Sequence, residues 1–271
     1  MRLIHLTLAT ILSCTMLPTW AGRPCKDEAP KTEVFRQAMS AAYANQLELD
    51  KLKPQVALIA RVGQDLSEYR LKFSHIGFVW RDPSQAEQWR VKHLLNQCGT
   101  AQSDLWTEGL GNFFMDDPFS YDALIIVPPP EVQAKLYAWL SDPAKMQKMR
   151  GERYNMLAYP FSTEYQNSNQ WVLEGLASAM SRDLEIKNRE QAQQWLKLMN
   201  YQPTELKINT LKRLGGRMFR ANIAFDDHPT DRRMSGKIDT ITVDSIVSFL
   251  QLQTKGSRAY VVPAQAVPAL Q

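Results

Sequence analysis

The chain has 271 residues, of which 44% are hydrophobic and 22% are charged, and it carries a formal net charge of +4. This composition is typical of a globular protein with a real core, and it excludes a disordered chain and a coiled coil. The modest basicity, and the absence of a glycine-framed aromatic motif or a phosphate-cradling glycine-rich loop, argue against nucleic-acid binding.

The N-terminus has the pattern of a targeting segment. Arg2 forms a short positive region, residues 3–17 are predominantly apolar, and residues 19–21 (Thr-Trp-Ala) supply a cleavage signal. We therefore predict a signal peptide at residues 1–21 and a periplasmic or secreted protein. A lipoprotein anchored at Cys14 is the second-ranked alternative. No later stretch approaches the roughly 20 apolar residues of a spanning helix, so no transmembrane segment is expected after signal removal.

Export leaves an even pair of cysteines, Cys25 and Cys98. In an oxidising compartment such a pair is typical of a disulfide bond. We predict that this bond ties the N-terminal segment to the body of the protein. A free catalytic thiol is the rival interpretation.

The first predicted element is a helix over residues 32–49, capped by Thr32. Its apolar positions follow a 3.6-residue period and are Phe35, Met39, Ala42, Tyr43 and Leu47. Pro54 ends the helix, and the apolar, partly β-branched run at residues 56–60 predicts a buried strand.

Two further strands are predicted at residues 73–80 and 89–95, with a turn signal between them. Strand alternation places His75 on one face of the first strand, with Gly77 beside it on the same face. His93 lies among apolar neighbours on one side of the second strand. Two histidines therefore fall on consecutive strands.

The remaining elements complete an α+β pattern. In chain order we predict a loop at 98–121, a strand at 123–127, helices at 131–140 and 143–150, a helix ending near 181, helices from 188 and at 204–214, a strand at 238–242 and a helix at 243–252. This order predicts a mainly antiparallel sheet of about four to five strands with flanking helices. We place a single domain at 22–262, with its core at 54–182, a helical extension at 183–252 and a flexible tail at 263–271.

A run of uncharged polar residues precedes the helix that ends near residue 181. This run is Gln166, Asn167, Ser168, Asn169 and Gln170. Polar side chains at a helix start can cap its free N–H groups, or they can hold a reactive atom where those groups stabilise negative charge. In the capping interpretation Asn167 is the N-cap, Gln170 is at N3, and Ser168 simply occupies the first helical position.

Four segments together resemble the bacterial family catalogued as domain of unknown function 2145. They are Val56 to Trp80, His93 to Asn96, Phe113 to Tyr121 and Tyr165 to Glu174, and the last is the most specific. A more distant resemblance is to permuted papain-like proteins of the NlpC-like and lecithin retinol acyltransferase-like group. In that group a strand bearing His-x-Gly comes first, and an Asn-Cys pair opens a later helix.

The papain-like resemblance implies a permuted papain-like arrangement and a set of catalytic roles. His75 matches the base, His93 the group that orients it, and Ser168 the nucleophile, with Gln166 serving the oxyanion. The sequence departs from the pattern at the nucleophile, since a serine hydroxyl stands where a thiol is expected and needs general-base help to react.

Two hypotheses for function follow. The first is an exported hydrolase or acyltransferase that acts on an amide or ester bond of the cell envelope. The second is a non-catalytic periplasmic binding or assembly module that uses the same cleft for a peptide or glycan, with Asn167, Asn169, Gln170 and Gly77 as binding residues. An envelope peptide, a glycan or a lipid-derived substrate would be the partner, and no cofactor or metal is expected.

Two other features leave alternatives open. Asp226 and His228, with Asp227 between them, could chelate a cation if extended, but aspartate is common before proline-containing turns. Residues 203–237 hold eight basic residues against four acidic ones. We interpret this stretch as a solvated face, with contact to an anionic envelope polymer as the alternative.

Overall fold

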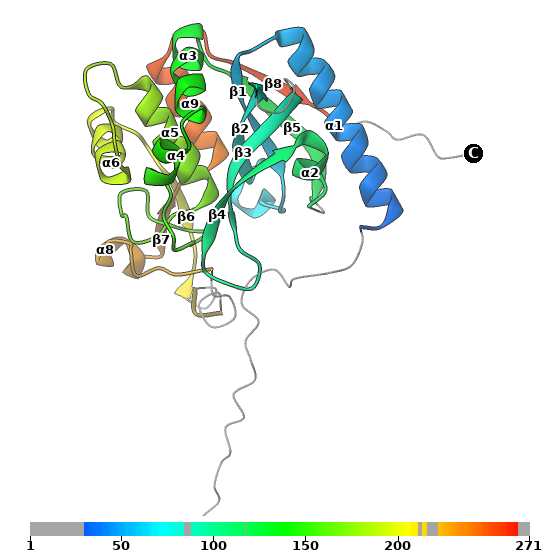
Figure 1. Ribbon diagram of the computed structural model, residues 1–271. Coiled ribbons are helices and arrows are strands. Elements are labelled where there is room, and N and C mark those ends of the chain that lie inside the picture. The colour runs from blue at the N-terminus through cyan, green and yellow to red at the C-terminus, as the bar shows by residue number, and fades with distance from the viewer. Residues whose placement is uncertain (1–29, 84–87, 117, 211–212, 216–221, 265–271) are drawn as a thin grey trace, which may run out of the picture.

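The computed structural model describes residues 30–83, 88–116, 118–210, 213–215 and 222–264 (Figure 1). The predicted signal peptide, Cys25 and all but the first two residues of the predicted tail lie outside the described residues. Within the described part of the chain, no helix is both long enough and apolar enough to cross a bilayer.

The centre of the fold is a six-stranded antiparallel sheet with the order β4-β3-β2-β1-β5-β8. Its strands are β1 (Val56–Val62), β2 (His75–Asp82), β3 (Gln88–Asn96), β4 (Ser103–Gly109), β5 (Ser120–Val127) and β8 (Arg258–Val262). The predicted α+β class and antiparallel pairing are confirmed, but the sheet has six strands where four to five were expected. The two strands that the sequence did not predict, β4 and β8, form its two edges.

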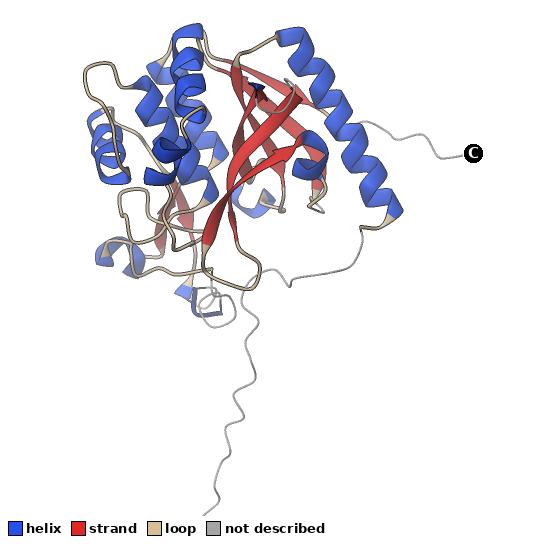
Figure 2. Ribbon diagram, in the orientation of Figure 1, coloured by secondary structure: helices blue, strands red, loops and turns tan. Residues whose placement is uncertain are grey.

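Helices cover both faces of this sheet (Figures 1 and 2). One face packs against α3 (Pro130–Leu140), α5 (Ser168–Met180) and α9 (Val243–Gln253), and we call it the α5 face. The other face packs against α1 (Thr32–Leu52) and α2 (Leu110–Phe114), and we call it the α1 face.

Strand alternation assigns each side chain to one of these faces. Ile76 and Phe78 of β2 point into the core of the α5 face, whereas Val79 belongs to the core of the α1 face. Gly175 of α5 lies so close to this sheet that a Cβ there would be 3.2 Å from the Phe78 ring. A larger residue at Gly175 would therefore push α5 away from β2.

The region after α5 is only partly helical, which corrects the predicted extension. It contains α6 (Arg189–Leu198), α8 (Thr230–Met234) and α9, together with a second sheet of β6 (Thr204–Lys207) and β7 (Lys237–Thr240). The helix predicted at 204–214 is wrong over residues 204–209, because residues 204–207 pair with β7 as a strand and residues 208–209 have no regular structure. The remaining described elements are η1 (Ser67–Tyr69) and α4 (Pro143–Lys148).

Helix ends follow the local chemistry of their sequences in most cases. Asn188 caps α6, accepting from Gln191 N, and Asp142 caps α4 ahead of Pro143. The predicted cap of α1 is wrong, because Thr32 is the first helical residue and Lys31 precedes it without a side-chain cap.

Candidate functional site

The polar run at the start of α5 caps the helix, as the capping interpretation predicts. Asn167 Oδ1 accepts a 2.7 Å hydrogen bond from Gln170 N. The Gln170 side chain does not reach back to complete a capping box, since its Nε2 donates to the carbonyl oxygens of Tyr159 and Pro160. Ser168 is the first helical residue and is only 5% exposed, with its Oγ 3.2 Å from Tyr154 Oη.

Gln166 is fully occupied by structural hydrogen bonds. Its Nε2 donates to Glu174 Oε2 at 2.6 Å and to Met149 O at 2.9 Å, while its Oε1 accepts from Gly151 N at 2.7 Å. A side chain held at both ends has no donor left to point at a substrate oxygen. The geometry therefore gives no support to the oxyanion role of Gln166.

Glu174 is the centre of a buried polar cluster that sequence reasoning did not identify. Besides Gln166, its carboxylate accepts from Arg189 Nε at 2.9 Å and Gln193 Nε2 at 2.8 Å. Burial raises the pKa of Glu174, and the Arg189 guanidinium opposes that shift. The cluster joins α5 to α6 through charge-assisted hydrogen bonds.

Asn169 serves a similar structural purpose. Its Nδ2 lies 3.3 Å from Ser74 O, just before β2, and 3.2 Å from Ile241 O, just after β7. The polar residues at the start of α5 thus tie the helix to four surrounding segments. Among the described residues, the side chains of this polar run are buried.

The two predicted histidines meet on the α1 face of the sheet. His75 Nε2 lies 2.8 Å from His93 Nδ1. Gly77 makes this approach feasible, because a Cβ at that position would be 3.1 Å from His93 Cβ and 2.9 Å from a Val91 methyl. Gly77 is therefore a packing residue. Phe113 of α2 covers both imidazoles, with ring centroids 5.9 Å from His75 and 5.5 Å from His93.

Charged groups surround the histidine pair. Arg61 pairs in register with His75 across β1 and β2, and its guanidinium binds Asp116 Oδ2 at 2.7 Å and the Phe113 carbonyl. His93 Nε2 lies 3.3 Å from Glu108 Oε2, within ion-pair distance but outside good hydrogen-bond geometry. A lone arginine in the otherwise apolar Val56–Val62 run is the signal that could have revealed Arg61.

Burial keeps both imidazoles neutral. It lowers the pKa of His75 well below the ordinary 6.5, and Arg61 lowers it further. Burial also lowers the pKa of His93, although contact with Glu108 opposes the shift. The cluster is therefore two neutral rings beside one buried cation, which costs free energy when either ring gains a proton.

Ser168 and His75 are not brought together. Helix α5 covers the face that carries Ile76 and Phe78, whereas His75 lies on the opposite face with His93. Ser168 Oγ contacts Tyr154 Oη, and burial raises the pKa of that tyrosine, so its hydroxyl keeps its proton. The predicted pairing of His75 with His93 is present, and the nucleophile–base pair of a papain-like site is absent from this geometry.

The Asp226-Asp227-His228 stretch is part of the fold. Asp227 Oδ2 accepts from Tyr159 N at 2.7 Å, and its Oδ1 lies 2.9 Å from His228 Nδ1. His228 Nε2 lies 3.0 Å from Asp239 O. Both ring nitrogens are thus used, and among the described residues no group of three or more His, Cys, Asp or Glu side chains could hold a metal ion.

The basic stretch and the cysteines complete the predicted features. Arg232 pairs with Glu205 at 3.0 Å and with Asp239, and Lys237 lies 3.6 Å from Glu205, so part of the positive charge is neutralised within the stretch. Cys98 is exposed in the turn after β3. The disulfide with Cys25 stays a prediction because Cys25 lies outside the described residues.

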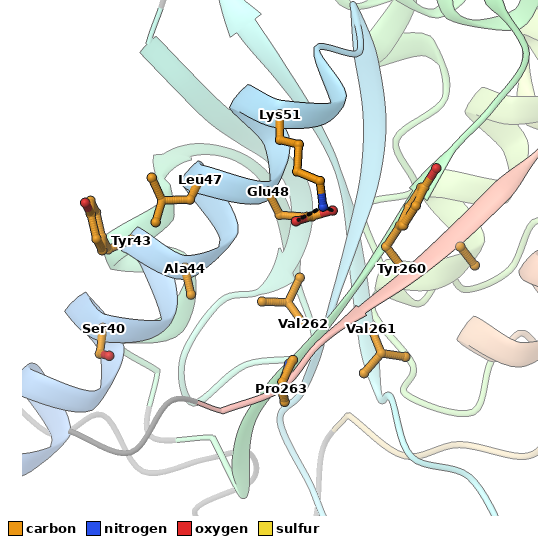
Figure 3. A pocket seen from close by; sticks show the side chains of 11 residues that line it. Ser40, Tyr43, Ala44, Leu47, Glu48, Lys51, Tyr260, Val261, Val262 and Pro263 are labelled. Carbon is orange, nitrogen blue, oxygen red and sulfur yellow. Dashed lines mark hydrogen bonds and ion pairs between the residues drawn. The ribbon is translucent and has the colours of Figure 1, made fainter.

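A groove between α1 and β8 hollows the surface of the described part of the chain, with a volume of about 850 Å³ (Figure 3). It is lined by Ser40, Tyr43, Ala44, Leu47, Glu48, Lys51, Ala259, Tyr260, Val261, Val262 and Pro263. The volume falls within the range of ligand sites. Sequence reasoning missed this groove because it assigned no structure to the β8 residues.

The apolar period of α1 explains one wall of this groove. The helix buries Ala38, Ala41 and Leu49 against the sheet. Tyr43 and Leu47, one turn apart on another side, remain 63% and 52% exposed and face the groove. Tyr43 and Leu47 thus give the groove an exposed apolar wall.

Residues 48–250 match a protein family described as uncharacterized protein conserved in bacteria (DUF2145). No curated protein and no solved structure matches the chain.

Proposed function

The chain belongs to the DUF2145 family of uncharacterised bacterial proteins, and we propose that it is an extracytoplasmic binding module that holds a polypeptide segment in the groove between α1 and β8. The signal-like pattern at residues 1–21 supports the location, in the periplasm or outside the cell. The proposal keeps the binding hypothesis but moves its site from the start of α5 to the groove.

The observation that carries the proposal is the exposed apolar side of α1 beside an edge strand. Tyr43 and Leu47 face a hollow whose opposite wall is the uncharged strand segment 259–262. Glu48 and Lys51, the charged residues of the lining within the described part of the chain, form an ion pair with each other at 3.1 Å. A neutral, largely aliphatic groove beside a strand edge suits a polypeptide better than a glycan, which needs many polar partners.

The hydrolase hypothesis has weaker support. It requires an exposed nucleophile within hydrogen-bond reach of its base. Ser168 is buried and contacts Tyr154, whereas the near neighbour of His75 is His93 on the other face of the sheet. We therefore favour binding over catalysis, and we do not propose a papain-like site.

The test compares two aspartate substitutions on the same helix. A peptide is first selected from a phage-displayed random library on the purified mature chain, and its affinity is measured by calorimetry. Tyr43→Asp is expected to weaken this affinity by about tenfold or more, since it places a charge in an apolar contact. Phe35→Asp is the control, because Phe35 is exposed on α1 but outside the groove.

Both substituted side chains are exposed, so both variants should keep the melting temperature of the parent chain. Equal affinity of the Tyr43→Asp variant and the parent would place the peptide elsewhere and contradict the proposal. Failure to enrich any peptide would contradict it as well.

A further inference from the structure

We infer that the occupant of the groove binds as an additional β-strand on the outer edge of β8, paired with the outward backbone groups of Ala259 and Val261, which have no partner strand in the described part of the chain. The inference rests on the proposed function and specifies its chemistry. The occupant is an uncharged, extended segment of another polypeptide, about five residues long, with apolar side chains at alternate positions.

The first argument identifies which groups of β8 face outwards. Ala264 N donates to Asp122 Oδ1 at 2.6 Å, so the N–H of residue 264 points toward β5. Backbone groups of alternate strand residues point the same way. Those of Tyr260 and Val262 therefore face β5, and those of Ala259 and Val261 face away from it.

Strand register gives the same answer from the other side of the sheet. Arg61 O accepts from Ser74 N, so the backbone N–H and C=O of Arg61 point toward β2. Those of its neighbour Ala60 therefore point toward β5. Ala60 pairs with Leu124, so the backbone groups of Leu124 point toward β1. Those of the next residue, Ile125, then point toward β8. Ile125 pairs with Tyr260, so the backbone groups of Tyr260 point inward, toward β5.

The two edges of the sheet differ in how they are protected. At the β4 edge, Ser103 N bonds to Glu152 O, and Asp104 and Glu108 add charges. Residues 259–262 of β8 carry no charge, and β8 has only β5 as a partner strand among the described residues. An uncharged edge that has no second partner strand within residues 30–264 as described is a template for another strand, and proteins usually block such an edge unless they use it.

The dimensions of the groove fit one short strand. The α1 residues that line it run from Ser40 to Lys51, which corresponds to about 16 Å of helix. Strand β8 has five residues and so spans about 16 Å as well. Figure 3 shows α1 and β8 side by side along this length.

The side chains of the walls define the composition of the occupant. Tyr260 and Val262 belong to the α1 face, so an added strand presents alternate side chains toward helix α1, whose Tyr43 and Leu47 line the groove. Glu48 and Lys51 are the charged residues of the described lining and pair with each other, so the lining offers an occupant no net charge. The groove therefore selects an uncharged segment.

The experiment uses the library-selected peptide and removes one outward N–H of the edge. Val261→Pro deletes a donor that faces away from β5, and proline is compatible with that side of an edge strand. Val261→Thr is the matched control, since it keeps the N–H and the β-branched shape. We expect the proline variant to bind the peptide about tenfold or more weakly and the threonine variant to bind within about twofold. N-methylation of alternate peptide nitrogens should weaken binding of the parent chain in the same way.

Each other outcome overturns a defined part of this account. Unchanged binding by Val261→Pro and by N-methylated peptides, with loss of binding in Tyr43→Asp, would overturn strand addition and leave the proposed function standing. Failure of all variants to change the affinity would overturn both. If light scattering finds a dimer that Val261→Pro converts to a monomer, the occupant is a second copy of this chain. That result would overturn the claim that the occupant belongs to another polypeptide.

Discussion

Replacing Arg189 with methionine is expected to lower the free energy of unfolding by about 3–5 kcal/mol. The substitution leaves the fully buried carboxylate of Glu174 without its only cationic partner among the described residues. It also removes the hydrogen bonds from Arg189 to Thr163 O and Tyr165 O. Urea unfolding followed by circular dichroism measures the change.

The double variant Arg189→Met with Glu174→Leu is the matched control. It removes the buried charge together with its partner, so it should recover a large part of the lost stability. If both variants are equally unstable, the loss comes from the backbone contacts of Arg189. In that case the unpaired, buried carboxylate of Glu174 does not lower the free energy of unfolding.

Acid is expected to destabilise the fold through the histidine pair. Both folded-state pKa values lie below the ordinary 6.5, so the unfolded chain binds more protons as pH falls below about 6.5. The contribution of the two neutral histidines to the free energy of unfolding is therefore fully present above that pH. It is lost as the pH falls toward their pKa values in the folded chain. The slope is about 1.4 kcal/mol per pH unit for each histidine.

The electrostatic surroundings of the pair make this loss specific. Arg61 repels a proton on His75, and the carboxylates of Glu108 and Asp116 lie on the side of His93. Unfolding free energies measured between about pH 5 and 6.5 should show a steeper slope in the parent chain than in His75→Gln. Equal slopes in the two proteins would mean that His75 is protonated alike in the folded and unfolded chains.

The sequence predicts the parts of this fold that have strong local signals. Strands β1, β2, β3 and β5 coincide with apolar or β-branched runs, and the caps Asn167 and Asn188 are visible as residue types. Strand alternation and the hairpin connection place His75 and His93 on consecutive strands, but their 2.8 Å contact is visible only in the structure.

The missed elements lack such local signals. Strands β6 and β8 have four and five residues, and each is held by a partner far away in the sequence, so pairing overrides weak local preference. The polar start of α5 signals a cap, but nothing local shows which face of the sheet α5 covers. That single choice separates Ser168 from His75, and packing at Phe78 and Gly175 decides it.

The groove could not be predicted for the same reason, because it depends on contacts between segments far apart in the sequence. An apolar stripe on α1 is readable from the sequence, but its exposure depends on β8, which pairs with β5 more than 130 residues earlier in the chain. The apolar period of α1 predicts a packed helix, whereas in the structure part of it lines the groove.

Hydrogen exchange of the β8 amides, recorded with and without the selected peptide, tests the central claim most directly. In the free chain we expect the amides of Tyr260 and Val262 to be protected by β5 and those of Ala259 and Val261 to exchange faster. Bound peptide should slow exchange at Ala259 and Val261 by about tenfold or more, with little change at Tyr260 and Val262. Unchanged exchange at Ala259 and Val261 with the peptide bound would contradict strand addition at this edge.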